Sequence, residues 1–449
     1  MNRTVRAMLV GALLLLALPL GADAPHVYAI AGARIVTAAG PIIESGTIVL
    51  RNGVIEAVGA TVAVPDGARL IDGKGLTVYP GLVDMGNGAG LEIPSMPPPQ
   101  NARTRLELER WKRQSILHPQ VEAANYVKSD APDLRRLAAS GITSVLSLPP
   151  GDVVRGRSSL INVVAPEDTP QIGNIADERR GLYVVKTPVA LHIALADRPS
   201  GTGYPESLFG VIAFIRQAFY DAGHYQAEWT AYEKSKGPRP AYDQALDALQ
   251  PALAGKLRVA FQAESALDIR RALGLAREFK LTPMIAGGQQ AGEVVDELKV
   301  QNVPVIFSLD FPVRARTLAP DADEPIRVVR ERVNVPKVPH ELERAGIMFA
   351  FQSAGLRDPA DFVRNAAKAV AAGLSPDAAI RALTINAATL AGAGDRLGSL
   401  EKGKIANVVV TTGDLFDERT KVKHVFVDGR LVEIDASAAP SGRGGRPTR

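Results

Sequence analysis

Turn signals separate short runs of apolar and β-branched residues at both ends of the chain. An Asn-Gly pair at residues 52–53, flanked by alternating hydrophobic residues, predicts a hairpin. Asp428-Gly429 closes a run near the C-terminus in the same way. Because both ends share this pattern, we predict a small β-sandwich domain formed from both chain ends. Its predicted strands cover residues 28–30, 33–37, 46–51, 53–58, 406–411 and 423–430.

Apolar strand-like runs alternate with helical patterns through the middle of the chain. This alternation predicts an α/β fold with a parallel sheet, and a (β/α)8 TIM-like barrel fits the length best. A doubly wound parallel sheet is the alternative. Ser375-Pro376-Asp377 predicts the start of a short helix. The predicted strands are 77–83, 142–148, 189–195, 258–262, 282–285, 304–308 and 347–351, and helical patterns cover 266–279, 291–300 and 359–373.

The first 24 residues have the pattern of a signal peptide. Arg3 and Arg6 precede an apolar run at 8–20, and Ala22-Asp23-Ala24 offers small residues for cleavage. The apolar run is shorter than the roughly 20 residues of a membrane-spanning helix, although an uncleaved anchor is the alternative. We therefore expect an exported protein, periplasmic or extracellular, without stable membrane insertion after cleavage.

Composition narrows the class of protein further. The 449 residues are 46% hydrophobic and 22% charged, as in ordinary globular proteins. The sequence has no Cys, which excludes disulfides and thiolate chemistry. The net charge is +4, but the basic residues alternate with acidic ones, apart from a Gly- and Arg-rich tail at 441–449. We therefore expect no nucleic-acid partner.

Two segments resemble the boundaries of the barrel in the amidohydrolase superfamily. IDGKGLTVYPGLVD at 71–84 resembles the passage from the β-domain into the first barrel strand. LTINAATLA at 383–391 and LGSLEKGKIANVVV at 397–410 resemble the return to the β-domain. The interior is similar to the imidazolonepropionase-like branch in SGITSV at 140–145, DIRRALGLAREF at 268–279 and VPVI at 303–306.

The resemblance implies a metal-dependent-hydrolase-type barrel with a β-domain beside it. It also implies a hydrolase of non-peptide C–N bonds, such as cyclic amides, or of peptide-like bonds. Zinc or another divalent metal would activate water at the mouth of the barrel. The expected organisation is a signal peptide at 1–24, β-sandwich segments at 25–78 and 399–435, the barrel at 79–398, and a disordered tail at 436–449.

Most of the superfamily's metal-ligand positions fall on residues that cannot bind metal. Family ligands are a His-x-His pair on strand one, a carboxylate or modified Lys on strand four, His on strands five and six, and Asp on strand eight. Only the strand-four position keeps a carboxylate, and zinc usually needs three or four protein ligands. We therefore expect no bound cofactor. By resemblance, the six positions are Gly86, Gly88, Asp197, Gln262, Gly287 and Ala354.

Several polar residues remain as candidates at the mouth of the barrel. Asp197 and Glu264 are the candidate acid and base of a metal-free enzyme. Candidate ligand-binding residues are Asn87, His192, Gln262 and Gln289, and Gln290 belongs to the same polar group. The other five histidines are scattered and are interpreted as surface or hydrogen-bonded side chains: His26, His118, His224, His340 and His424.

Three functions remain open from the sequence. The first is the family's metal-dependent hydrolysis, against which the missing ligands argue. The second is a pseudoenzyme that binds a small molecule at the barrel mouth or forms an inactive partner of an active amidohydrolase. The third is a metal-free enzyme. A homo-oligomer is also expected as a possible assembly, because barrels of this superfamily commonly associate.

Overall fold

The computed structural model describes residues 27–94, 103–128, 131–164, 184–195, 204–315, 317–319 and 321–434. The predicted signal peptide, Asp197, His26 and the C-terminal tail lie outside these residues. Within the described ranges, no helix combines the length and apolar character needed to cross a membrane.

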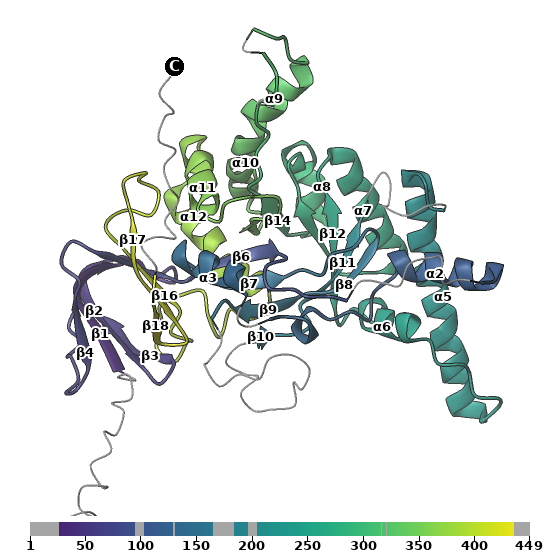
Figure 1. Cartoon of the computed structure of the whole chain (residues 1–449), viewed down its shortest axis with the longest axis horizontal. Coiled ribbons are helices and arrows are strands. Elements are labelled where there is room, and N and C mark those ends of the chain that lie inside the picture. Colours follow the sequence, from purple (N-terminus) through teal and green to yellow (C-terminus); the bar gives the residue numbers. More distant parts are fainter. Residues whose placement is uncertain are drawn as a thin grey trace, which may run out of the picture.

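Strands from both chain ends form one mixed sheet (Figure 1). β5 of the N-terminal segment pairs antiparallel with β16 of the C-terminal segment, with Tyr79 opposite Val409. The assembly of one β-domain from both ends is therefore observed, whereas the sandwich form remains a prediction. The strands are β1 (Val27–Ile35), β2 (Ile43–Arg51), β3 (Val54–Gly59), β4 (Arg69–Asp72), β5 (Thr77–Pro80), β16 (Val408–Thr411), β17 (Val422–Val427) and β18 (Arg430–Val432).

The middle of the chain supplies a second set of strands in two ladders. One has the order β10-β9-β7-β6 and the other β15-β14-β13-β12-β11-β8. Neighbours from β11 to β15 are parallel, as the alternating pattern predicts. The strands are β6 (Leu82–Asn87), β7 (Ile142–Ser147), β8 (Val154–Arg157), β9 (Ser159–Asn162), β10 (Val184–Lys186), β11 (Ala190–Ala194), β12 (Arg258–Ala263), β13 (Pro283–Gly287), β14 (Val305–Ser308) and β15 (Phe349–Gln352).

The segment formed by β8 and β9 connects the two ladders and runs antiparallel to both neighbours. β9 pairs with β7, and β8 pairs with β11. The sequence did not predict these strands, because VRGRSSLIN lacks a continuous apolar run and contains a glycine. On the other side, β15 meets β6 through hydrogen bonds from Ser353 to Asp84. The ladders themselves do not close, so the closed barrel remains a prediction.

Helices cover the middle strands, and some follow the sequence pattern closely. The helix predicted at 266–279 is α7, and Ser375 caps α12 as predicted, accepting a hydrogen bond from the backbone N–H of Ala378. The pattern at 291–300 is divided into a 3-10 turn and α8. The longest described helix, α5, was not predicted, and it contains His224.

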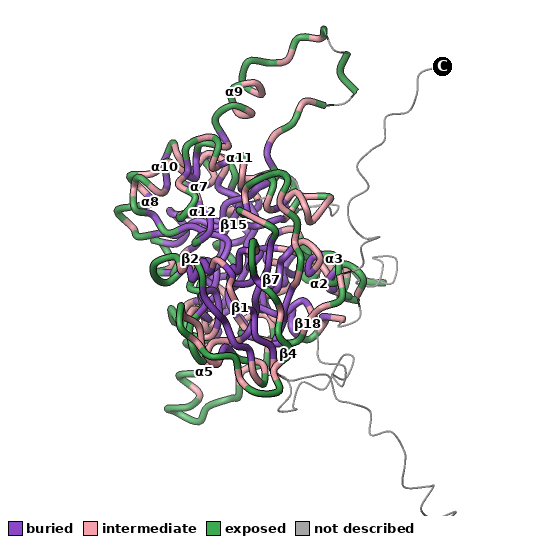
Figure 2. The backbone as a smooth tube through the Cα atoms, turned by 90° about the vertical axis from the view of Figure 1, so that its left-hand side faces the viewer, coloured by how far each residue is buried: buried purple, intermediate pink, exposed green. Residues whose placement is uncertain are grey.

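The helices are α2 (Arg105–Ile116), α3 (Pro132–Ala139), α5 (Leu208–Ser235), α6 (Gln244–Leu253), α7 (Ala266–Phe279), α8 (Val295–Val300), α9 (Ile326–Asn334), α10 (Val338–Ala345), α11 (Asp361–Ala371), α12 (Pro376–Leu383) and α13 (Ile385–Leu390). The 3-10 turns are η2 (Ala123–Asn125), η3 (Ala291–Val294) and η4 (Val335–Lys337). Helix α9 stands on a mostly exposed projection from the buried centre (Figure 2).

Alternating side chains divide the core into two layers. Leu191, Ile193 and Phe261 belong to a large cluster with apolar side chains of α5 and α7. Ala260 and Met284, on the opposite faces of their strands, belong to a separate cluster with the other strands' inward side chains. This alternation defines an inner face on each strand, and the inner apolar side chains form the floor beneath the strands' carboxyl ends.

A buried polar network joins the terminal sheet to the middle strands. The Asn407 side-chain amide donates to Ser144 Oγ (3.0 Å) and Asn162 Oδ1 (2.9 Å). Asn162 Nδ2 donates to Asp428 Oδ2 (2.8 Å), and the backbone N–H of Asp428 donates to Asn407 Oδ1 (2.9 Å). We call Ser144, Asn162, Asn407 and Asp428 the junction cluster. It binds four segments that are distant in the sequence.

Candidate functional site

Strand register brings polar residues together at the carboxyl ends of β12, β14 and β15. Gln352 lies opposite Ser308, and continuing the ladders by one residue brings Gly288 and Glu264 to the same level. Residues two or four positions earlier on these strands pack in the inner apolar cluster. The four residues, which we call the rim layer, therefore lie on the inner face above an apolar floor.

Gln352 takes the space beside the first family ligand position. A Cβ added to Gly86 would lie 2.5 Å from Gln352 Oε1 and 3.2 Å from Gln352 Cβ. The approach of β15 to β6 therefore requires a residue without a side chain at this position. Gln352 is 1% exposed, and its Nε2 has no hydrogen-bond partner within the described structure. A buried amide donor without a partner costs free energy, which a ligand acceptor would recover.

Asp84, whose partner Ser353 follows Gln352 in the chain, is a fully buried carboxyl group. Ser353 donates to Asp84 through its backbone N–H (2.8 Å) and its Oγ (2.5 Å). Asn87 Nδ2 donates to Asp84 Oδ2 (3.2 Å) and to Ser353 Oγ (2.8 Å). Burial raises the pKa of Asp84 to about 6, although these hydrogen bonds oppose the rise. Asn87, a candidate for ligand binding, thus orients this carboxyl group.

Glu264 covers Gly287, the family's strand-six ligand position. A Cβ at Gly287 would lie 2.2 Å from Glu264 Oε1, and its φ of +97° also favours glycine. Gln262 Nε2 donates to Glu264 Oε1 (2.8 Å). Burial raises the pKa of Glu264 to about 7; hydrogen bonds from Gln289 and Gln262 oppose this, and the Asp310 charge adds to it.

Glu264 reaches solvent, although protein atoms crowd its carboxyl group. The residue as a whole is exposed, yet burial is the largest cause of its raised pKa. Because water reaches this side chain, its charge is screened, and the raised pKa matters less for stability than it would in a fully buried group. Nearby, Gln289 Nε2 donates to the backbone oxygen of Asp310 (2.7 Å), and Gln290 Oε1 accepts from the backbone N–H of Ala266 (3.0 Å). The predicted grouping of these glutamines is observed.

The residues at the family ligand positions do not fit a metal ion. Gly86, Gly88 and Gly287 offer no donor, Ala354 offers none, and Gln262 is already bound to Glu264. Across the described ranges, no group of three or more His, Cys, Asp or Glu is arranged to hold a metal. Asp197 lies outside the described residues, so its position is not part of this comparison.

His192, a candidate for ligand binding at the barrel mouth, is buried on β11. It is 4% exposed, and its Nε2 lies 2.8 Å from Ser158 Oγ. Burial, followed by the charge of Arg155, lowers the pKa of His192 to about 3, so the ring is neutral. The other described histidines lie apart: His118 after α2, His224 on α5, His340 on α10 and His424 on β17.

The sequence analysis missed Asp84, Ser353 and Asp310. Asp84 interrupts the apolar run of its strand, and a polar residue within such a run is a usable signal. No local pattern marks Ser353 as its partner, because 269 residues separate the two. The close approach of β15 to β6 in the folded protein brings them together.

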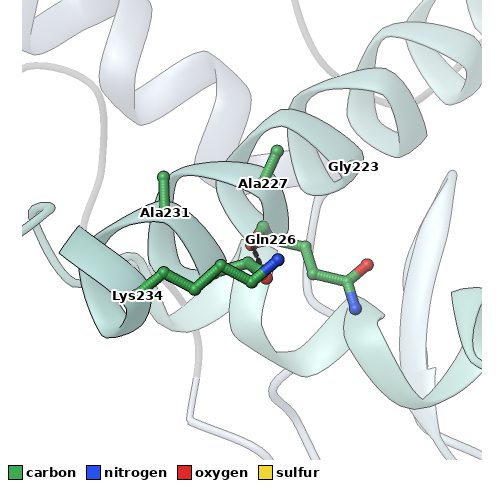
Figure 3. A pocket seen from close by; sticks show the side chains of 6 residues that line it. Gly223, Gln226, Ala227, Ala231 and Lys234 are labelled. Atoms are coloured by element: carbon green, nitrogen blue, oxygen red, sulfur yellow. Dashed lines mark hydrogen bonds between the residues drawn. The ribbon is translucent and has the colours of Figure 1, made fainter.

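A separate hollow lies on the exposed face of α5 (Figure 3). Small side chains leave this space, and the only drawn hydrogen bond joins Thr230 Oγ1 to the backbone oxygen of Gln226 (2.8 Å). Nothing in its lining identifies a ligand, so we assign it no function. Its residues are Gly223, Gln226, Ala227, Thr230, Ala231 and Lys234.

Comparison with known proteins identifies the class to which this fold belongs. The amidohydrolase family model matches residues 280–432. An amidohydrolase from Thermotoga maritima MSB8 is 24% identical with a TM-score of 0.73, and the match covers 90% of this chain and 99% of that one. A search of curated proteins found no match.

Two further solved structures share the fold at lower similarity. A putative prolidase from Bifidobacterium longum has 19% identity and a TM-score of 0.53, covering 91% of this chain and 95% of that one. A Xaa-Pro dipeptidase has 15% identity and a TM-score of 0.51, covering 91% and 100%. The family model matches part of this chain, and the solved structures share its fold; both findings support the amidohydrolase superfamily.

Proposed function

We propose that this protein binds a small amide- or peptide-like molecule at the carboxyl ends of its strands. We also propose that it has lost the superfamily's metal-dependent hydrolysis of C–N bonds at the family positions. The observation that carries both points is the packing of Gln352 against Gly86. A neutral amide extends into the space beside the position where the family's first histidine would stand.

The chemistry of the rim layer supports an amide ligand. A glutamine side chain offers both a donor and an acceptor, as an amide ligand does. Gln352 Nε2 is buried without a partner within the described structure, so a ligand carbonyl would satisfy it. The apolar floor would receive the nonpolar part of the ligand, in a site of the usual mixed character. The solved relatives include proteins named for acting on peptides, which favours the same ligand class.

The first experiment measures metal and ligand binding on the same protein. Purified mature protein, supplied with zinc, manganese or iron, is analysed for metal per chain. Calorimetry then measures binding of N-acetylglycinamide to wild type, Gln352→Met and the control Gln217→Met, whose amide lies on exposed α5. We expect no stoichiometric metal, binding by wild type and the control, and at least about tenfold weaker binding by Gln352→Met.

Two results would contradict these proposals. A stoichiometric metal that Asp197→Ala removes, together with hydrolysis of a dipeptide panel, would contradict the proposed loss of metal chemistry. Equal ligand affinity in Gln352→Met and wild type would remove Gln352 from the site.

A second candidate function is metal-free acid–base hydrolysis by Glu264, with Asp197 as the other group. A pKa of about 7 suits a general acid or base that works near neutral pH. This candidate requires hydrolysis of an amide substrate in the presence of a chelator. Glu264→Gln would then reduce the rate about 100-fold or more. Activity unchanged by this substitution would exclude the candidate.

Five further proposals accompany this function. The middle strands form a closed (β/α)8 barrel, supported by the contact of Ser353 with Asp84 and by the bridging β8–β9 segment. The terminal sheet is a β-sandwich. The chain belongs to the imidazolonepropionase-like branch, as its interior motifs suggest. The protein is exported, and its partner is a second copy or an active amidohydrolase.

A further inference from the structure

The pairing of β8 with β11 contains an extra residue, Arg155. His192 lies opposite Gly156, and the next residue, Ile193, lies opposite Val154. Arg155 therefore has no cross-strand partner and occupies a β-bulge. Bulges often redirect a side chain at a functional site.

The Arg155 guanidinium lacks the partners that a buried cation normally has. Its Nε is buried and donates to no hydrogen-bond acceptor within the described structure. The described ion pairs include Arg157 with Glu122 (3.2 Å) but none for Arg155. Burial lowers the pKa of Arg155, and the charge of Asp152 only partly opposes this. The residue as a whole is half-buried, and an anion that accepts a hydrogen bond from the buried Nε–H would satisfy this donor.

The surroundings of Arg155 place this charge beside the inner face of the strands. Its charge acts on His192, which shares the inner face of β11 with Ala190. His192 is neutral and bound to Ser158, so it does not compensate the cation. Ala194, the next inward residue of β11, pairs with Gln262, whose side chain contacts Glu264 of the rim layer. Arg155 is therefore close enough for its charge to act on His192, which lies on the inner face below the rim.

We propose that Arg155 is an anion-binding residue that receives a carboxylate or phosphate group of the ligand. The inference rests on the proposed amide-binding function and narrows it: the ligand carries an anionic group next to its amide. A guanidinium can bind either anion through two hydrogen bonds, which makes Arg more suitable here than a point charge.

The experiment uses the full mature chain and two matched ligands. Calorimetry at constant ionic strength compares N-acetylglycine, which carries a carboxylate, with the neutral N-acetylglycinamide. Sodium acetate and inorganic phosphate are measured alone to distinguish the two anions. We expect wild type to bind N-acetylglycine about tenfold more tightly than N-acetylglycinamide or better, and Arg155→Gln to lose this preference.

Arg157→Gln is the matched control, because Arg157 is on the same strand but is paired with Glu122. It should keep the preference for the carboxylate. Thermal melting verifies that each variant folds, and Arg155→Lys replaces Arg155→Gln if the latter does not. The lysine variant should keep a weaker preference for the carboxylate ligand, since it retains the positive charge but cannot form two parallel hydrogen bonds to it.

The outcomes separate this inference from the proposed function. If Arg155→Gln retains the full preference, or if wild type binds no tested anion, the anion site is wrong. If wild type binds both amides equally, amide binding survives and the anion site does not. If acetate or phosphate binds through Arg155 while neither amide binds, the anion site stands and the proposed ligand class falls.

Discussion

The two ends of the middle strands contain buried polar groups of different character. In the junction cluster, side chains from distant segments bond to one another, and the Asn407 side-chain amide bonds to all three other members. In the rim layer, Gln352 keeps a buried donor without a partner within the described structure, beside a glycine that leaves it room. The first arrangement stabilises the fold, and the second leaves hydrogen-bonding capacity for a ligand.

The presence of buried polar groups therefore does not by itself identify a functional site. Both ends contain a carboxyl whose pKa is raised to about 7, Asp428 at the junction and Glu264 at the rim. Asp428 Oδ1 also has no partner within the described structure, but it belongs to a carboxyl whose neutral form is favoured by burial. The rim differs because its unsatisfied atom is a neutral amide that protonation cannot relieve.

The largest expected effect is at the junction, in the dependence of stability on pH. The pKa of Asp428 is raised from 3.8 to about 7 by burial, so between these values the folded state holds a proton that the unfolded state releases. Wild-type stability should therefore fall by a few kcal/mol as pH rises from about 4 to about 7. Asp428→Asn cannot titrate, and its stability should change less over this range.

Urea unfolding of wild type and Asp428→Asn at several pH values measures this difference. Asn also suits the left-handed backbone of this position, where φ is +50°. If the free energies of unfolding of the two proteins changed in parallel with pH, the pKa of Asp428 would be the same in the folded and unfolded states, and the prediction would be wrong.

The next largest effect concerns Gly86, which lies against Gln352 of the rim layer. Gly86→Ala places a Cβ 2.5 Å from Gln352 Oε1, so it should reduce the free energy of unfolding by about 1–3 kcal/mol. Gly88→Ala is the control, because a Cβ there meets nothing within 4 Å, and it should stay within about 0.5 kcal/mol of wild type. Denaturant unfolding gives both values.

Replacing Gln352 by Ala in the Gly86→Ala background should recover part of the loss, since it removes the clashing side chain. Equal stabilities for Gly86→Ala and Gly88→Ala would mean that β15 and β6 do not approach as closely as described.

The smallest effect is the pH dependence contributed by Glu264. Burial raises its pKa from 4.5 to about 7, so this group also favours folding at low pH, and its contribution is lost as pH rises toward 7. Because the residue is exposed overall, solvent screening should make this slope smaller than that of Asp428. Comparing unfolding of wild type and Glu264→Gln across this range tests the order. If Glu264 contributed a larger change of unfolding free energy with pH than Asp428, the expected order of the two sites would be wrong.

Local sequence signals were sufficient for many elements and for part of the site. The apolar periodicity of 266–279 gave the bounds of α7, and Ser375-Pro376 gave the start of α12. The grouping of Gln262, Glu264 and Gln289 also followed from strand position. These features depend on residues close together in the chain or on a motif that fixes their strand.

Tertiary structure decided the features that depend on contacts between distant segments. The antiparallel β8–β9 segment pairs with strands on both sides, and its own residues carry no regular apolar pattern. The packing of Gln352 on Gly86 and the bonds of Ser353 to Asp84 join strands at opposite ends of the middle segment. The sequence by itself determined the periodic elements. The contacts of Gln352 with Gly86 and of Ser353 with Asp84 came from folding, because the approach of distant segments is not encoded by neighbouring residues.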